Sequence, residues 1–282
     1  MAEIIDGKLV SSALRNELKD KIAEFKSENG KAPGLAVIVV GNDPASAVYV
    51  RNKHKACIEV GIDSHQIELP EQTSEDELLS KIDELNADGG VNGILVQLPL
   101  PKHINEERVI ERISPMKDVD AFSPSSVGRI MIGNYSLLPC TPAGIIALLD
   151  YYKVEIEGKR CVVIGRSNIV GKPMAMLLME RNGTVTVCHS RTKELSKICR
   201  EADIIVVAIG KPEFLRGDMV KDGAVIIDVG INRLNSGKLV GDVCFDEVSK
   251  VASMITPVPG GVGPMTITML LYNTLSAAKI QK

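Results

Sequence analysis

Short runs rich in valine and isoleucine alternate with segments whose apolar residues recur every three or four positions, and this alternation constrains the fold most. Helical spacing of this kind joins Val10, Leu14, Leu18, Ile22 and Phe25. Residues 35–40, 62–69 and 93–98 are predicted to be strands, with helices between them. Because a strand-helix-strand repeat implies parallel pairing, we expect an α/β fold.

The helices between these strands have predictable ends. Ser46 is expected to cap a helix that runs to Gly61, where glycine is a plausible C-terminal stop. Ser74 and Glu77 form a capping-box pair ahead of the next helix. Six prolines follow between residues 99 and 142, so we expect loops and short helices there, joining two lobes.

The pattern restarts more regularly in the second half of the chain. Residues 161–165, 184–189, 202–210 and 224–230 are predicted to be strands of a doubly wound, Rossmann-like parallel sheet. We expect an N-terminal α/β catalytic domain over residues 1–120, a dinucleotide-binding domain over residues 121–282, and a cleft between them. A closing helix over about 265–282 is expected to pack back on the first domain.

Composition excludes several classes of function. The chain has 33 lysines and arginines against 36 acidic residues, so its net charge of −3 gives no general attraction for nucleic acid or an anionic membrane. Aromatic residues are 3% and tryptophan is absent, which disfavours base stacking. No stretch is apolar enough for a membrane span. The six cysteines show no metal-ligand spacing, so we expect reduced thiols, no metal and a cytoplasmic location.

The segment VVIGRSNIVGKP at residues 162–173 predicts a phosphate-binding turn. A buried strand meets a glycine turn and then a helix, so backbone N–H groups and the positive helix end can face a pyrophosphate. Ser167 and Val170 occupy glycine positions of the usual pattern, and Gly171 comes one residue late. A plain strand-helix connection is therefore an alternative.

The end of the next strand bears on the choice of cofactor. An NAD-specific enzyme usually has an acidic residue there for the ribose 2′-hydroxyl. This chain has Ser190 and Arg191, and Arg166 adds a second cation in the turn itself, so NADP is preferred over NAD. The alternative is a solvated arginine that happens to follow a strand.

The first lobe offers a possible catalytic group. Tyr49 and Lys53 are four residues apart in a predicted helix, so they project from one face. Gln97 falls at the carboxyl end of a strand, the edge at which open parallel sheets bind ligands. Asp120 lies in the loop region between the lobes. A solvated helix face and a charged turn are the simpler interpretations of these residues.

Five motifs together resemble one family. They are SAVYVRNK at 46–53, QLPLP at 97–101, KDVD at 117–120, GRSNIVGKP at 165–173 and PGGVGPMT at 259–266. In this order they resemble the signatures of the bifunctional methylenetetrahydrofolate dehydrogenase/methenyltetrahydrofolate cyclohydrolases, the FolD family, and the resemblance covers essentially the whole chain. One departure is Ala121, where the family commonly has glycine.

The resemblance implies two reactions in one shared site. NADP-dependent oxidation of 5,10-methylenetetrahydrofolate gives 5,10-methenyltetrahydrofolate, and water then opens it to 10-formyltetrahydrofolate, in one-carbon metabolism that serves purine biosynthesis. It also implies a homodimer. The implied catalytic residues are Tyr49, Lys53, Gln97 and Asp120.

The implied binding residues fall into two sets. Cofactor binding is carried over to Gly165, Arg166, Ser167, Ser190, Arg191 and Ile231. Folate binding is carried over to Tyr49, Asp120, Gly260, Gly261, Val262 and Pro264, the last four in a segment that the family keeps mobile.

Burial and a hydrogen bond from Gln97 are expected to shift Lys53 towards the neutral amine that a proton shuttle needs.

Three other functions are alternatives to this one. A monofunctional dehydrogenase would have lost the cyclohydrolase, and a silent dinucleotide sensor would be expected to lose its lysine site. The presence of Tyr49, Lys53 and Gln97 together argues against both. A different two-lobed NADP oxidoreductase, such as a shikimate-dehydrogenase-like enzyme, would share the architecture without the folate motifs.

Overall fold

The computed structural model describes residues 1–43, 47 and 49–282, and its chain divides into two compact units. The three-stranded unit contains residues 13–140 and 267–282, and the six-stranded unit contains residues 1–12 and 141–266. Residues 121–140 belong to the three-stranded unit, beyond the boundary expected at residue 120. The reason is burial, because Leu137 and Cys140 pack into the core of that unit.

The three-stranded unit is built on a parallel sheet of order β3-β2-β4. Its strands are β2 (Gly34–Val40), β3 (Asp63–Leu69) and β4 (Gly93–Val96), connected by α2 (Pro44–Val60) and α3 (Glu75–Ala87). Parallel pairing is therefore confirmed. The predicted cap of α2, Ser46, lies outside the described residues. Gly61 follows the end of α2 with a φ of 88°, which confirms the predicted glycine stop.

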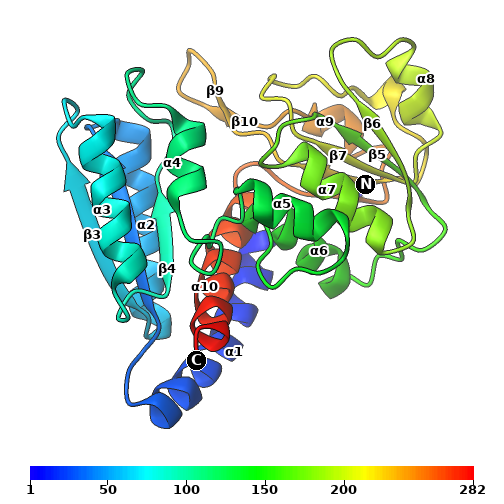
Figure 1. Cartoon of the computed structure of the whole chain (residues 1–282). Coiled ribbons are helices and arrows are strands. Elements are labelled where there is room, and N and C mark those ends of the chain that lie inside the picture. The colour runs from blue at the N-terminus through cyan, green and yellow to red at the C-terminus, as the bar shows by residue number, and fades with distance from the viewer. The chain divides into compact units, whose positions relative to one another are not determined.

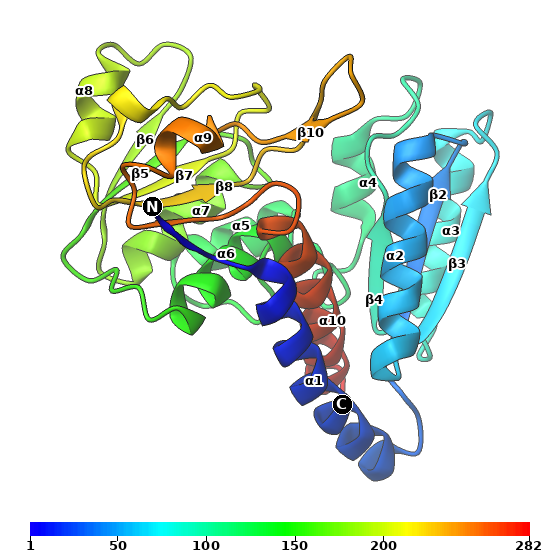
Figure 2. The same ribbon diagram turned by 180° about the vertical axis from the view of Figure 1, so that it is seen from behind.

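Alternate residues of β2 build two cores, one on each face of the sheet. Leu35 and Val37 pack with α2, α1 (Gly7–Asn29) and α10 (Val262–Ile280). Ala36 and Ile38 pack on the other face with α3 and α4 (Glu106–Arg112). Figure 1 shows α3 and α4 in front of this sheet, and Figure 2 shows α2 covering it from behind. Burial on both faces explains why β2 is a continuous apolar run.

Local signals fix several helix starts. The capping box at α3 is confirmed, because the Ser74 hydroxyl accepts from the Glu77 N–H and the Glu77 carboxylate accepts from the Ser74 N–H. The Ser123 side chain caps α5 (Pro124–Met131), one of the short helices in the proline-rich stretch. A single parallel bridge between Ile94 and Asp118 adds a further backbone segment beside β4.

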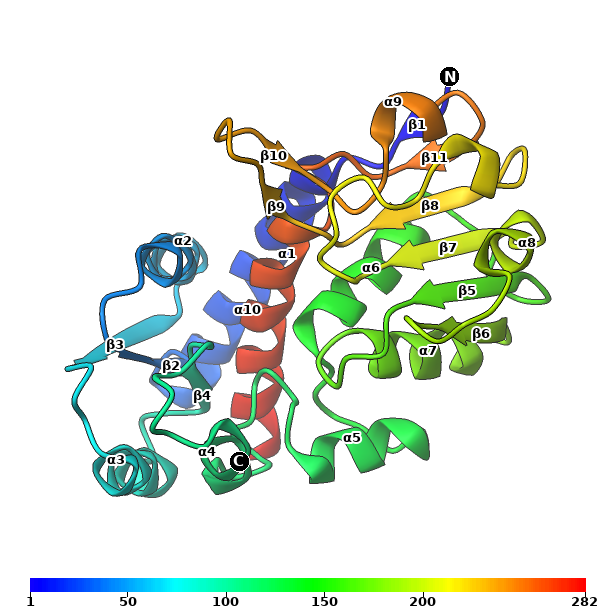
Figure 3. The same cartoon turned by 90° about the horizontal axis from the view of Figure 1, so that it is seen from above.

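The six-stranded unit has the parallel order β1-β11-β8-β7-β5-β6. The chain runs through β5 (Arg160–Ile164), α7 (Gly171–Glu180), β6 (Thr184–Cys188), α8 (Leu195–Arg200), β7 (Ile204–Val207) and β8 (Val225–Asp228). Since β6 and β7 lie on opposite sides of β5, the winding reverses between β5 and β7 (Figure 3). The predicted doubly wound sheet is confirmed, and its ligand crevice belongs at this reversal.

The remaining elements are short. β1 (Glu3–Ile4) and β11 (Met254–Ile255) complete the sheet, while β9 (Asn232–Arg233) and β10 (Leu239–Val240) form an antiparallel pair. The others are α6 (Cys140–Tyr151), α9 (Phe245–Val248) and the 3₁₀ helix η1 (Gly217–Met219). Because α6 begins at Cys140, Thr141 lies in its first turn. No helix among the described residues is long and apolar enough to cross a membrane.

Candidate active site

Lys53 and Gln97 meet at the carboxyl edge of the three-stranded sheet. Lys53 is 9% exposed on α2, and its Nζ donates to Gln97 Oε1 at 3.0 Å. Gln97 directly follows β4 and continues its pairing, because its N–H donates to the Ile38 carbonyl at 2.9 Å. This places both side chains at the sheet edge where ligands bind in open α/β folds.

The direction of this hydrogen bond corrects one expectation. Gln97 Nε2 donates to the Leu98 carbonyl at 2.7 Å, so the amide oxygen is the atom that faces Lys53. Gln97 therefore accepts from the lysine, whereas we expected it to donate.

The two acids of the KDVD motif have different surroundings. Asp118 is 2% exposed and accepts from the Ser123 N–H and the Ser126 hydroxyl, both at 2.9 Å. Asp120 is half-buried, and burial raises the pKa of its carboxyl while the positive charge of Lys53 opposes that rise. Asp118 thus holds the loop, and Asp120 lies within electrostatic reach of Lys53.

The loop around Asp120 is held by a neighbouring helix. Asn273 of α10 donates to the Val119 carbonyl at 2.8 Å and to the Leu138 carbonyl at 2.7 Å. Ala121 has a φ of 54°, in the left-handed region that favours glycine, which explains physically why glycine suits this position. The thiol of Cys140 lies 3.7 Å from Asp120 Oδ1, and burial followed by the nearby Asp120 charge raises the pKa of that thiol well above its usual range.

Tyr49 lies one turn before Lys53 on α2. Its side chain is 43% exposed, in contrast to the buried lysine. An exposed aromatic ring beside a buried amine can pack against the face of an aromatic ligand.

The glycine turn lies at the winding reversal of the six-stranded sheet. Gly165 has a φ of 131°, and a Cβ on it would lie 2.3 Å from the carbonyl oxygen of Ala208, just after β7. A Cβ on Gly171 would lie 2.4 Å from the carbonyl oxygen of Gly165. Both positions therefore require glycine, and the late Gly171 closes the turn against Gly165. This tight backbone cradle fits a pyrophosphate at a helix start.

Ser167 has a specific task within this turn. Its Oγ accepts from the N–H groups of Val170 and Gly171, both at 3.2 Å. Ser167, which occupies the second glycine position of the usual pattern, thus provides an acceptor for backbone N–H groups at the start of α7. Arg166 is exposed at the rim of the same turn.

Ser190 and Arg191 lie at the same sheet edge as the turn. β6 pairs with β5 in a register that sets Cys188 opposite Ile164, and the Gly165 N–H donates to the Cys188 carbonyl at 2.9 Å. Ser190 and Arg191 follow that strand end and are both exposed. The fold therefore brings the two predicted cofactor segments to one edge.

The remaining predicted residues follow β8 and precede or begin α10. Ile231 is 48% exposed. Gly260 has a φ of 110°, and Gly261 is buried against Gly7, where a Cβ on Gly7 would lie 1.7 Å from the Gly261 carbonyl oxygen. Val262 and Pro264 belong to the first turn of α10, which begins earlier than the expected residue 265. The positive φ therefore accounts for Gly260, and close packing accounts for Gly261, on which a Cβ would lie 2.7 Å from the Pro257 carbonyl oxygen.

Three supporting residues were not predicted from the sequence: Asp228, Asp242 and Asn273. Asp228 ends an apolar run at the carboxyl edge of the sheet, so the rule that singled out Gln97 points to it as well. Asp242 and Asn273 carry no such signal, because their partners are distant in the sequence. Among the described residues, no three His, Cys, Asp or Glu side chains gather as they would around a metal ion.

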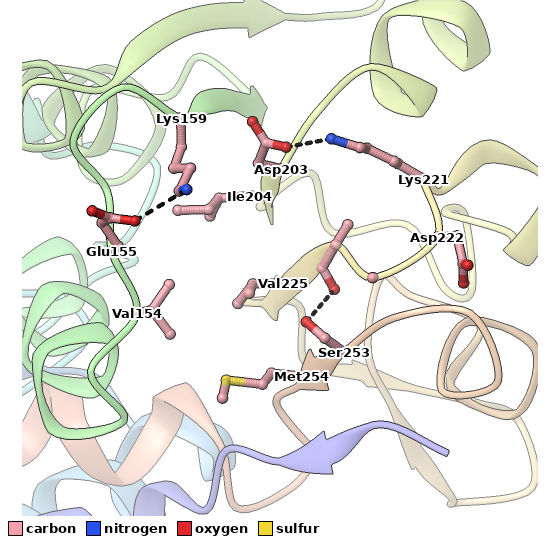
Figure 4. A pocket seen from close by; sticks show the side chains of 12 residues that line it. Val154, Glu155, Lys159, Asp203, Ile204, Lys221, Asp222, Val225, Ser253 and Met254 are labelled. Atoms are coloured by element: carbon pink, nitrogen blue, oxygen red, sulfur yellow. Dashed lines mark hydrogen bonds and ion pairs between the residues drawn. The ribbon is translucent and has the colours of Figure 1, made fainter.

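A separate cavity of about 330 Å³ opens at the opposite edge of the six-stranded sheet, at the amino ends of β7, β8 and β11. It contains none of the predicted site residues. Four of its charged groups form two ion pairs, because Lys159 pairs with Glu155 at 3.1 Å and Lys221 pairs with Asp203 at 2.5 Å (Figure 4). This cavity is therefore not the candidate active site.

The arrangement defines a two-domain α/β enzyme that binds a dinucleotide at one sheet and presents a lysine and an amide at the edge of another. Two family models match the chain: the catalytic domain of tetrahydrofolate dehydrogenase/cyclohydrolase over residues 5–120, and its NAD(P)-binding domain over residues 139–282. The chain belongs to the tetrahydrofolate dehydrogenase/cyclohydrolase family, the FolD family of the motifs above.

Individual relatives agree with this assignment over their full lengths. The bifunctional protein FolD of Acetivibrio thermocellus is 60% identical over 280 residues, covering 99% of this chain and 98% of its own. The crystal structure of FolD from Campylobacter jejuni matches with a TM-score of 0.97 at 53% identity, covering 100% of both chains. The Trypanosoma brucei enzyme, crystallised with NADP and an inhibitor, matches with a TM-score of 0.95 at 42% identity, covering 99% of this chain and 98% of its own.

Proposed function

We propose that the chain oxidises 5,10-methylenetetrahydrofolate with NADP+ and hydrolyses the methenyl product to 10-formyltetrahydrofolate in one shared site. The observation that carries this proposal is the hydrogen bond from buried Lys53 to Gln97 at the carboxyl edge of the three-stranded sheet. Asp120 is within electrostatic range of the same lysine, whose positive charge opposes the rise in the Asp120 pKa. An amine, an amide and a carboxyl group are what a proton shuttle and a folate site need together.

Lys53 moves the proton in the hydrolytic step. The methenyl substrate carries positive charge on its one-carbon bridge, so an ammonium beside that carbon would oppose its formation. In the proposed hydrolytic step, Lys53 accepts a proton from the attacking water. Gln97 holds the amine in place through the oxygen that its bond to Leu98 orients.

Asp120 and Tyr49 hold the folate. A carboxylate accepts paired hydrogen bonds from the N–H groups of a pterin ring, and Asp120 is the acid of the KDVD motif whose pKa the charge of Lys53 lowers against the effect of burial. Tyr49 packs its exposed ring against the aminobenzoyl group. The family resemblance also assigns folate contacts to Gly260, Gly261, Val262 and Pro264.

The six-stranded unit binds NADP, which accepts the hydride when bound. The Gly165 turn and Ser167 fit the pyrophosphate, because Gly165 and Gly171 let the backbone pack tightly enough to bring this turn to the start of α7. Arg166, Ser190 and Arg191 bind the 2′-phosphate, and Ile231 packs against the cofactor. The exposed arginines supply the charge that distinguishes NADP from NAD.

A two-wavelength assay tests the proposed function. Enzyme, NADP+ and 5,10-methylenetetrahydrofolate are mixed, and NADPH and the methenyl compound are followed separately. NADPH formation with little methenyl build-up supports both activities. Stoichiometric methenyl accumulation would leave only the dehydrogenase, and no NADPH would overturn the proposal.

We further propose a cytoplasmic homodimer that pairs through β6. Among the described residues, β6 hydrogen-bonds to β5 alone, and Val187 on it is 38% exposed, whereas β5 and β7 are largely buried. Such an open edge can pair with the same strand of a second copy about a two-fold axis. Light scattering after size exclusion tests this: Val187→Lys should shift a dimer towards monomer, and a monomeric wild type would overturn it.

A further inference from the structure

Asp228 and Asp242 are buried at the carboxyl edge of the six-stranded sheet and take no part in the chemistry above. They are 4% and 0% exposed. Asp228 ends β8, and Asp242 follows β10 (Figure 3). Buried carboxylates are stable only when donors surround them, so the donors reveal what each side chain holds in place.

Asp228 holds the backbone that carries Asp242. Its Oδ1 accepts from the Gly230 N–H at 3.0 Å and from the Asp242 N–H at 2.9 Å. Its Oδ2 accepts from the Val243 N–H at 3.0 Å. The position of Asp242 is therefore fixed from β8.

Asp242 in turn joins two other segments. Its Oδ2 accepts from the N–H groups of Ile209 at 2.7 Å and Gly210 at 2.9 Å, just beyond β7. Its Oδ1 accepts from Asn232 Nδ2 at 2.9 Å, at the start of β9. One carboxylate thus ties the end of β7 to the segment after β8.

Two glycines make this arrangement possible. A Cβ on Gly230 would lie 2.2 Å from Asp242 Oδ1, and a Cβ on Gly241 would lie 1.8 Å from Asp228 Oδ2. Each carboxylate therefore sits directly against backbone of the segment that bears the other acid. Such close packing leaves little freedom for either loop.

Both segments held by Asp242 border the expected cofactor site. Ile209 directly follows Ala208, whose carbonyl oxygen packs against Gly165 at the winding reversal. Asn232 directly follows Ile231, which is 48% exposed. The Asp242 carboxylate is fully buried and contacts these segments through the N–H groups of Ile209 and Gly210 and the side chain of Asn232.

We propose that Asp242 is a positioning residue for the dinucleotide, which holds the loop after β7 and the Ile231 segment in the arrangement that receives NADP. This inference rests on the proposed function, because it assumes that NADP binds at Gly165. The bonds require an acceptor at both oxygens, and a carboxylate supplies this. An asparagine would place its amide N–H₂ against one of these donors.

The test exploits that geometry with a side-chain exchange. In Asp242→Asn, the new amide can keep its oxygen towards Ile209 and Gly210, but its N–H₂ then faces the donor of Asn232. Adding Asn232→Asp restores an acceptor opposite that N–H₂. Each variant is titrated with NADPH by calorimetry without folate, and its cyclohydrolase turnover is measured on supplied methenyl substrate.

The NADPH dissociation constant should rise about tenfold in Asp242→Asn, the effect of losing one well-placed bond, and return to within about threefold of wild type in the exchange variant. The cyclohydrolase KM for the methenyl substrate should not move in parallel. Asn232→Ala removes one of the three hydrogen bonds that the Asp242 carboxylate accepts, and it serves as the milder variant if Asp242→Asn does not fold. It should raise the NADPH dissociation constant about threefold.

Asp203→Asn is the matched control, since Asp203 lies in the same unit at the amino edge of the sheet and accepts from the Arg160 N–H. It should leave the NADPH dissociation constant unchanged. The inference is overturned if Asp242→Asn and Asn232→Ala bind NADPH as wild type does, if the control weakens binding equally, or if the exchange restores nothing. Failure of the proposed function is distinguishable, because the wild type itself would then not bind NADPH.

Discussion

The backbones of Gly165 and Gly171 touch, so that a Cβ on Gly171 would lie 2.4 Å from the Gly165 carbonyl oxygen and 2.8 Å from the Arg166 N. Gly171→Ala should therefore force the turn open, at a cost of about 1–3 kcal/mol in the free energy of unfolding. It should also weaken NADPH binding, because the cradle for the pyrophosphate changes shape. Urea denaturation and NADPH titration measure the two effects.

Gly128→Ala is the contrasting glycine substitution. Gly128 lies exposed in α5, and nothing within 4 Å would meet an added Cβ. Because alanine favours the helix, this variant should gain about 0.5–1 kcal/mol in the free energy of unfolding, with NADPH affinity unchanged. Equal effects of the two substitutions would remove the packing argument for Gly171.

Lys53→Gln should abolish the cyclohydrolase. It removes the only nitrogen of the Lys53–Gln97 pair that can accept a proton, so turnover of supplied methenyltetrahydrofolate should fall at least about 100-fold. Lys55→Gln, an exposed change on the same helix, should leave turnover near wild type. An undiminished rate in Lys53→Gln would contradict the proton-shuttle role.

Arg166→Ala together with Arg191→Ala should reduce the preference for NADP. Charge-assisted bonds to a phosphate contribute about 1.5–3 kcal/mol each, so losing both should raise the KM for NADP+ about 100-fold or more while that for NAD+ changes little. Lys193→Ala, which removes another exposed cation nearby, should have a small effect on both constants. A parallel rise for both cofactors would remove the 2′-phosphate argument.

Asp228 should make stability depend on pH. Burial raises its pKa from 3.8 to about 7, although the N–H groups of Asp242, Val243 and Gly230 oppose the rise. In the unfolded chain the carboxyl ionises near its ordinary pKa, so between about pH 4 and pH 7 the folded state binds more protons. This contribution to stability is present at low pH and is lost as the pH rises through about 7.

Urea denaturation near pH 5 and near pH 8 measures this effect. The Asp228 contribution should fall by about 2–3 kcal/mol between these two conditions. Asp228→Asn removes the titrating group, so its loss of stability over the same interval should be smaller by that amount. An identical pH dependence in the two proteins would show that Asp228 is ionised throughout.

The sequence by itself determined the architecture and most of the candidate residues. Valine-rich runs predict strands buried on both faces, as β2 is, and the capping pair Ser74–Glu77 fixes the start of α3 locally. Strands of two residues, such as β1 and β11, are too short to carry a periodic signal. The sequence therefore did not predict them, and only the structure shows them beside their partner strands.

The tertiary structure alone decided how the candidate residues are held. The orientation of the Gln97 amide depends on its bond to the Leu98 carbonyl. Asn273 of the last helix holds the Asp120 loop through the Val119 carbonyl. The bond from the Ile209 N–H to Asp242 joins segments that are more than 30 residues apart in the sequence. Such bonds depend on which strands become neighbours and on the space that glycines leave. Local patterns predict which residues reach a sheet edge, whereas packing across the sheet decides which atoms face one another there.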